Sequence, residues 1–170
     1  MKILVCIKQV PDTDDIKWTE NNTMQREGVE SIINPCDLYA MDVALKLKSI
    51  LADVELTVLT MGPLQAKDML KKAIALGFDR GVLLSDKKFA GADTYATGKT
   101  IAAAIKSKFS DFDLIICGQY AIDGDTAQTG PSIASQLDIP QITFVKDIKK
   151  ATDESFYSTR QIEDGLETVK

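Results

Sequence analysis

The chain has 170 residues, of which 45% are hydrophobic and 26% are charged, as is typical of one globular domain with a substantial core. Its net charge of −5 argues against a nucleic-acid-binding protein, because such proteins carry basic surfaces. No apolar run approaches the roughly 18 residues of a membrane span, and Lys2 leads directly into an apolar segment without a signal peptide, so we expect a cytoplasmic protein.

Histidine and cysteine usage limits the chemistry that the side chains can perform. The chain contains no histidine, which is the commonest general base and the commonest protein ligand of transition metals. The three cysteines, Cys6, Cys36 and Cys117, form no CxxC motif, so neither a structural disulfide nor a zinc site is expected. If the protein takes part in chemistry, we expect a bound cofactor to carry it.

Apolar runs that alternate with helical spacing predict an α/β fold, a parallel sheet with helices on both faces. Strands are predicted at 2–7, 54–61, 81–85, 113–117 and 142–145. Helices are predicted from 34–37 to about 47, from Pro63 to Leu76, from 93 to about 109, and at 127–137. Asn34 or Asp37 is the expected cap of the first helix, and Asp93 that of the third.

The remaining segments are less regular. Residues 9–15 are predicted to form a turn. Weak alternation of apolar and polar residues at 16–18 and 24–33 predicts a small antiparallel hairpin. Polar strands at 148–157 and 159–169, with turn signals at 152–154 and at Asp164-Gly165, predict an antiparallel meander. We therefore expect a single domain over 1–170, with an α/β core at about 1–145 and an antiparallel extension at 146–170.

Residues 118–130 form the most informative stretch. They follow a buried strand, precede a helix, and are small, polar and acidic, which is where open α/β sheets bind nucleotides. Residues 92–97 form a second helix start with threonine hydroxyls and free N–H groups. Each start could hold an anion or could simply be a capped helix. The chain lacks both GxGxxG after its first strand and GxxxxGK[ST], which disfavours a standard dinucleotide fold and a P-loop.

Asp123 and Asp125 allow three interpretations. They could form a carboxylate pair for acid–base work or Mg²⁺, accept hydrogen bonds from ribose hydroxyls or an adenine amino group, or hold the loop by bonding its own backbone. We favour the loop role, and we predict no metal site. Cys6 and Cys117 lie within apolar strands and are expected to be small core residues.

Several segments, in this order, resemble the small (beta) subunit of electron-transfer flavoproteins. The segments are 5–10, Asn34-Pro35, Gly62-Pro63, 75–81, the Gln-x-Ala-Ile-Asp-x-Asp-x-x-Gln-Thr-Gly pattern at 119–130, and 163–167. Together they cover essentially the whole chain. The resemblance implies a sheet of the adenine-nucleotide-binding (HUP-like) type. It also implies an electron carrier that pairs with an alpha subunit holding FAD and serves partners of the acyl-CoA dehydrogenase type, rather than a self-sufficient enzyme.

The resemblance implies one of two ligands for this subunit. It would hold either structural AMP or a second FAD, and with FAD it would be electron-bifurcating and take electrons from NADH. Residues 89–97 resemble the bifurcating type, so we favour FAD; a stand-alone adenine-nucleotide-binding module is the other alternative. Family members continue beyond the position of Lys170, so we expect the chain to be C-terminally short.

Nucleotide contacts are carried over from the family residue by residue. Those shared by both ligands would be Cys6, Asn34, Asp37, Met61, Gly118, Ala121, Ile122, Asp123, Asp125, Thr126, Gln128 and Thr129. The contacts special to the flavin type would be Asp93, Thr94 and Thr97.

Overall fold

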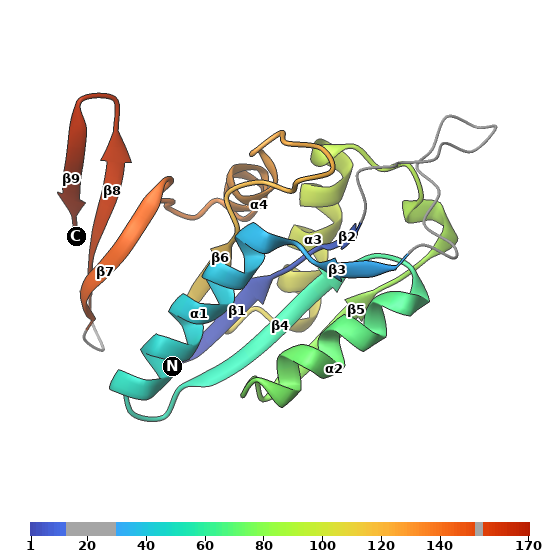
Figure 1. Ribbon diagram of the computed structural model, residues 1–170, viewed down its shortest axis with the longest axis horizontal. Coiled ribbons are helices and arrows are strands. Elements are labelled where there is room, and N and C mark those ends of the chain that lie inside the picture. The colour runs from blue at the N-terminus through green and yellow to red at the C-terminus, as the bar shows by residue number, and fades with distance from the viewer. Residues whose placement is uncertain (13–29, 152–154) are drawn as a thin grey trace.

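Four parallel strands in the order β5–β4–β1–β6 form the central sheet of the computed structural model, which describes residues 1–12, 30–151 and 155–170 (Figure 1). The apolar first strand lies inside the sheet, where Val5 pairs with Val58 on one side and with Ile116 on the other. The strands are β1 (Lys2–Cys6), β4 (Glu55–Met61), β5 (Arg80–Leu84) and β6 (Leu114–Cys117). The expected parallel α/β core is therefore confirmed.

Helices cover both faces of this sheet, two on each (Figure 1). Because side chains alternate along a strand, Ile3 and Val5 pack under α1 and α2, whereas Leu4 packs under α3 and α4. Short 3₁₀ turns, η1 (Leu64–Ala66) and η2 (Lys87–Phe89), precede α2 and α3. The helices are α1 (Pro35–Ile50), α2 (Lys67–Ala75), α3 (Thr94–Lys108) and α4 (Thr129–Leu137).

A small antiparallel pair replaces part of the predicted turn. β2 (Gln9–Pro11) pairs with β3 (Ser31–Ile33), so the expectation of a turn throughout 9–15 is wrong for its first three residues. The pairing joins segments that lie about twenty residues apart in the sequence, which local turn chemistry cannot reveal. The predicted hairpin segments at 16–18 and 24–29 lie outside the described residues.

The predicted fifth strand of the parallel sheet, at 142–145, is wrong. Pro140 lacks an N–H group for a strand ladder, and Phe144 adopts a positive φ of 57°, which breaks an extended backbone. Val145 instead begins an antiparallel three-stranded sheet of β7 (Val145–Ala151), β8 (Phe156–Ile162) and β9 (Gly165–Val169). The expected C-terminal meander is thus confirmed, with an earlier start.

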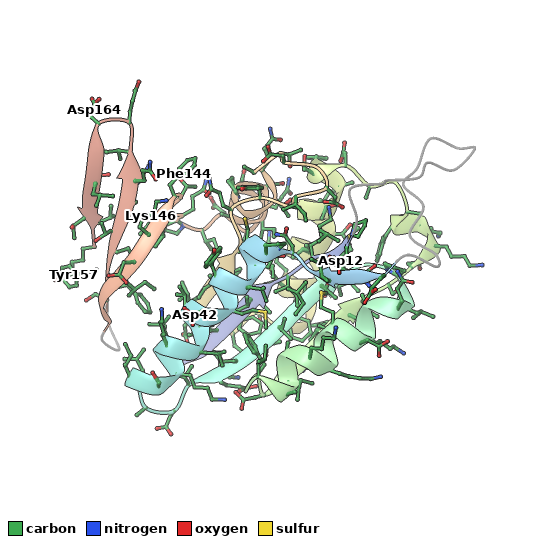
Figure 2. The ribbon with its side chains drawn as sticks, in the orientation of Figure 1. Asp12, Asp42, Phe144, Lys146, Tyr157 and Asp164 are labelled. Atoms are coloured by element: carbon green, nitrogen blue, oxygen red, sulfur yellow. The ribbon has the colours of Figure 1, made fainter. Side chains whose placement is uncertain are left out.

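The three-stranded sheet stands beside the core rather than continuing it (Figure 1). Phe144 and Lys146 lie at the end of β7 nearer the core, and Asp164 lies at the tip of the β8–β9 hairpin (Figure 2). Ile148 and Phe156 pack against the hydrophobic cluster beneath α1, which ties this sheet to the core. Among the described residues, no helix has both the length and the apolarity needed to cross a bilayer.

Candidate functional site

The candidate site lies at the carboxyl edge of the sheet, where β1 and β6 end side by side. Cys6 pairs with Cys117 at these strand ends. The chain after β1 leads to α1 on one face, and the chain after β6 leads to α4 on the other. In open α/β sheets this divergence of neighbouring connections opens a crevice that binds ligands.

Asn34 fixes the loop that follows β6. Its side chain is buried, 1% exposed, and both of its polar groups bond the loop backbone. Nδ2 donates to the carbonyl of Tyr120 at 2.7 Å, and Oδ1 accepts from the amide of Ile122 at 3.1 Å. Asn34 occupies the N-cap position of α1 but makes no side-chain cap bond. It therefore acts here as a scaffold residue for the loop.

Asp37, in the first turn of α1, contacts both the residue that follows β1 by two positions, Lys8, and the start of the loop after β6, Gly118. Its Oδ2 accepts from the amide of Lys8 at 2.7 Å. Gly118 passes so close that a Cβ on it would lie 2.1 Å from Asp37 Oδ1, so only glycine fits. Burial raises the pKa of Asp37 to about 6, although hydrogen bonds from Lys8, Asn34 and Gly118 oppose that rise.

A partly buried ion pair connects the loop to the end of β1. The ammonium of Lys8 lies 2.5 Å from Asp123 Oδ1, and the Asp123 side chain is only 3% exposed. The Asp123 carboxylate is therefore engaged by a cation that lies between strand and loop. Lys8 was not among the predicted site residues, and its position directly after the first strand was the available signal.

The tip of the loop is a tight turn with exposed residues. The amides of Gly124 and Asp125 both bond the carbonyl of Ala121, at 3.1 and 2.7 Å. Asp125 and Ala127 adopt positive φ angles of 48° and 52°, which cost L residues roughly 1–2 kcal/mol each. Thr126 and Gln128 are exposed beside them. Strain of this kind persists when the surrounding structure over-determines it, and it concentrates at ligand sites.

The two helix starts predicted as anion sites lie next to each other. The hydroxyl of Thr94, at the start of α3, donates to Gln128 Oε1 at 3.5 Å, just before α4. Behind this contact the helices pack closely, since a Cβ on Gly98 would lie 2.2 Å from Ser132 Oγ. The starts of α3 and α4 are therefore side by side in the structure.

The two starts differ in how their N–H groups are satisfied. Asp93 caps α3 by accepting from the amide of Ala96 at 2.7 Å, as its sequence position predicted. The N-cap residue of α4, Gln128, makes no side-chain cap bond, so the amides of Thr129 and Gly130 at the positive end of that helix are not capped by it. The α4 start is the better of the two for an anion.

The remaining predicted residues line the edge between these features. Cys6 and Cys117 face α3 and α4 together with half-buried Met61, and they form an apolar floor. Thr97 lies one turn into α3, where its amide bonds the carbonyl of Asp93.

The predicted site residues lie on both faces of the sheet. Asn34 and Asp37 lie on the α1 side, and Asp93, Thr94 and Thr97 lie on the opposite side. The structure thus gathers the predicted residues at one edge but divides them between its two faces.

A cavity of about 580 Å³ lies beside Gln119, between the loop and the C-terminal sheet. Lys146 and Arg160 line it on the sheet side, with Phe144 and Ile162. None of the site residues carried over from the family lines this cavity, so sequence reasoning missed it. It depends on the placement of the meander, which no local pattern specifies.

Comparison with known proteins connects this edge to a family. The model of the electron transfer flavoprotein domain matches residues 21–170. A protein of Acetobacterium woodii named "Caffeyl-CoA reductase-Etf complex subunit CarD" is 50% identical over 171 residues, which is 100% of this chain and 64% of the relative. "Electron transfer flavoprotein subunit beta" of Megasphaera elsdenii is 52% identical over 159 residues, or 90% of this chain and 59% of the relative.

A third relative carries a different name. "Acryloyl-CoA reductase electron transfer subunit gamma" of Anaerotignum propionicum is 48% identical over 172 residues, covering 100% of this chain. The chain spans 64% of that relative's length, so it is shorter than the proteins it matches. With a domain match over most of its residues, the chain belongs to the electron transfer flavoprotein family, among proteins named as beta subunits.

Proposed function

We propose that this chain is the nucleotide-binding part of an electron-transfer flavoprotein beta subunit that binds FAD. The subunit would take electrons from NADH and deliver them to the FAD of an alpha subunit, and onward to a partner of the acyl-CoA dehydrogenase type. The names of two relatives support a role in electron transfer to an acyl-CoA-type partner, because they place those proteins in caffeyl-CoA and acryloyl-CoA reductase systems. We further propose that residues 1–170 form a single domain in the cytoplasm.

The observation that carries the proposal is the contact between the two helix starts. Thr94 and Gln128 join the start of α3 to that of α4 at 3.5 Å. FAD contains a diphosphate, and two adjacent helix starts offer more N–H groups and hydroxyls to a diphosphate than one start would. The uncapped amides of Thr129 and Gly130 fit one phosphate, so the donor set suits such a ligand.

The roles of the protein groups follow from their positions. Thr129 and Gly130 would bind phosphate, and Thr94 would add a hydroxyl. Asn34 and the Lys8–Asp123 pair hold the loop in its shape before any ligand arrives, which lowers the cost of binding. Cys6, Met61 and Cys117 form an apolar floor beneath the site. FAD, when bound, supplies the electron-transfer chemistry.

One observation favours AMP as a second candidate. The carboxylate of Asp93 already occupies the first turn of α3, where it bonds the amide of Ala96. A negative charge at that start repels a second phosphate, whereas AMP needs only the uncapped start of α4. A subunit with structural AMP would contribute a stable fold and loop without carrying electrons itself.

Calorimetric titration of the purified chain with FAD and with AMP separates the candidates. We expect FAD to bind, and we expect Thr94→Val to weaken FAD binding by about fivefold, since one hydrogen bond contributes about 1 kcal/mol. AMP binding should be unchanged in that variant. Asp86→Ala, which removes the cap of η2 outside the site, is the matched control.

The whole complex gives the second readout. Co-purification with an alpha subunit should yield two flavins per heterodimer, one of them reducible by NADH. One flavin and one AMP would contradict the FAD proposal and support the structural-nucleotide version. Nucleotide binding without association with any alpha subunit would instead favour a stand-alone module.

A further inference from the structure

Cys6 and Cys117 form a dithiol at the ends of two adjacent strands. Each is the last residue of its strand, and the register of β1 and β6 makes them direct partners. Neighbouring strands lie about 4.8 Å apart. That spacing falls within the range of Cα separations, about 4.4–6.8 Å, that a disulfide can bridge.

The two side chains also point the same way. Both belong to the hydrophobic cluster between the sheet and helices α3 and α4, with Cys6 buried and Cys117 half-buried. The first turn of α4 lies beside Cys117, since a Cβ on Gly130 would lie 3.7 Å from Cys117 Sγ. A hydrogen bond with Cys117, together with burial, raises the pKa of the Cys6 thiol, which favours the protonated form of Cys6.

We propose that Cys6 and Cys117 are an oxidation site at which hydrogen peroxide converts the two thiols into a reversible intramolecular disulfide. Cys117, the more accessible of the two, attacks the peroxide as its thiolate. An S–O bond forms, the O–O bond breaks, and one water leaves. The sulfur of Cys6 then attacks the sulfur of Cys117, the S–O bond breaks, and a second water leaves with the transferred protons. Two thiols thereby lose two electrons to one molecule of hydrogen peroxide.

The disulfide would join the ends of β1 and β6 directly beneath the candidate site. The sheet ladder already fixes both backbones, so the bond cannot adopt every favourable geometry, and a constrained disulfide is readily reduced by small thiols. The proposal stands on the strand register and does not depend on which nucleotide the site binds. Cys6 and Cys117 are free thiols in the structure, and the disulfide forms only on oxidation.

Cys36 supplies an internal control. It is the second residue of α1, and an electrostatic interaction and a hydrogen bond with Cys36 raise the pKa of Tyr120, which places Cys36 beside the loop rather than in the strand pair. Cleavage after lysine and arginine separates the three cysteines into peptides 3–8, 27–46 and 109–146. Each cysteine can therefore be followed by mass.

The test oxidises the folded protein with hydrogen peroxide, then unfolds it and alkylates the remaining thiols. We expect the number of alkylated cysteines to fall from three to one, with peptide 3–8 linked to peptide 109–146. Reduction by dithiothreitol should restore all three. Cys36→Ser should still form the link, and Cys117→Ser should keep both remaining cysteines alkylated. Circular dichroism of each variant confirms that it folds.

Three outcomes would overturn the proposal. Alkylation of all three cysteines after oxidation would show an unreactive pair. Oxygen addition to Cys117 without loss of the Cys6 thiol would show that the sulfurs do not meet. A disulfide that includes Cys36 would show that the loop, and not the strand register, decides pairing.

Discussion

At the scale of single residues, the closest approach in the site is between Gly118 and Asp37. A Cβ at position 118 would lie 2.1 Å from Asp37 Oδ1 and 2.9 Å from its backbone nitrogen, so Gly118→Ala must displace α1 or the loop. We expect a loss of about 1–3 kcal/mol in unfolding free energy, measured by urea denaturation. Gly124→Ala is the matched control, because nothing lies within 4 Å of its Cβ position. Equal effects of both changes would contradict this geometry.

The buried carboxylate of Asp37 predicts a pH dependence of stability. Its pKa is about 6 in the folded protein, against an ordinary value of 3.8, so the folded state binds more protons between these values. Its contribution to stability is therefore full below pH 3.8 and is lost as pH rises through 6.

Comparison with Asp37→Asn isolates this effect. Between pH 4 and 7 the unfolding free energy of the wild type should fall relative to that of Asp37→Asn by up to about 3 kcal/mol, since one pKa unit corresponds to about 1.4 kcal/mol. Urea denaturation at several pH values measures the difference. Ser49→Ala, an exposed change on the same helix, should keep the wild-type profile. Parallel profiles for wild type and Asp37→Asn would refute the shift.

These residues also show what single-sequence reasoning can reach. The capping role of Asp93 was predictable, because a cap depends on three neighbouring residues. Asn34 was assigned as a helix cap or a nucleotide contact, yet its amide bonds the loop 86 and 88 positions later. Lys8 reaches Asp123 across 115 positions. Partners at such separations are set by strand order, which a local pattern does not encode.

At the scale of elements, the site depends on how closely α3 approaches α4. A Cβ on Gly98 would lie 2.2 Å from Ser132 Oγ and 2.8 Å from Ser132 Cβ. Gly98→Ala should therefore destabilise the protein by about 1–3 kcal/mol, although alanine favours a helix by about 1 kcal/mol.

A double-mutant cycle identifies the contact responsible. In a Ser132→Gly background, the unfolding free energy lost through Gly98→Ala should shrink by at least about 1 kcal/mol, because both clashing atoms are gone. Thermal or urea unfolding of the four proteins measures this coupling. The same loss in both backgrounds would place the strain elsewhere.

Elements with strong local signals were predictable, and elements set by distant pairing were not. The apolar runs of β1 and β4 and the stop at Gly77, which has a φ of 118°, were visible in the sequence. The short β2–β3 pair was not, since three residues carry little periodicity. Residues 142–145 look like a strand by composition, but only Val145 belongs to a strand, and it pairs with β8; composition does not specify a partner.

At the scale of the whole molecule, the chain divides into a well-packed core and a thinly attached sheet. Hydrophobic clusters lie on both faces of the parallel sheet, whereas β9 is exposed along most of its length. Only Ile148 and Phe156, among the described side chains of β7–β9, pack against the cluster beneath α1. Regions with few buried apolar contacts open at lower free energy than the core.

This arrangement predicts separate opening of β7–β9, measurable by hydrogen–deuterium exchange under native conditions. Phe156→Ala removes one of the two apolar side chains that attach β7–β9 to the core. Loss of a half-buried ring costs about 1–2 kcal/mol, so hydrogen exchange in β7–β9 should accelerate roughly five- to thirtyfold. Exchange in β1 and β4 should stay unchanged. Leu166→Ala, at a side chain that is 66% exposed, is the control and should alter neither region. Equal acceleration in the core would show one cooperative unit, because the loss of this contact would then be shared by every strand.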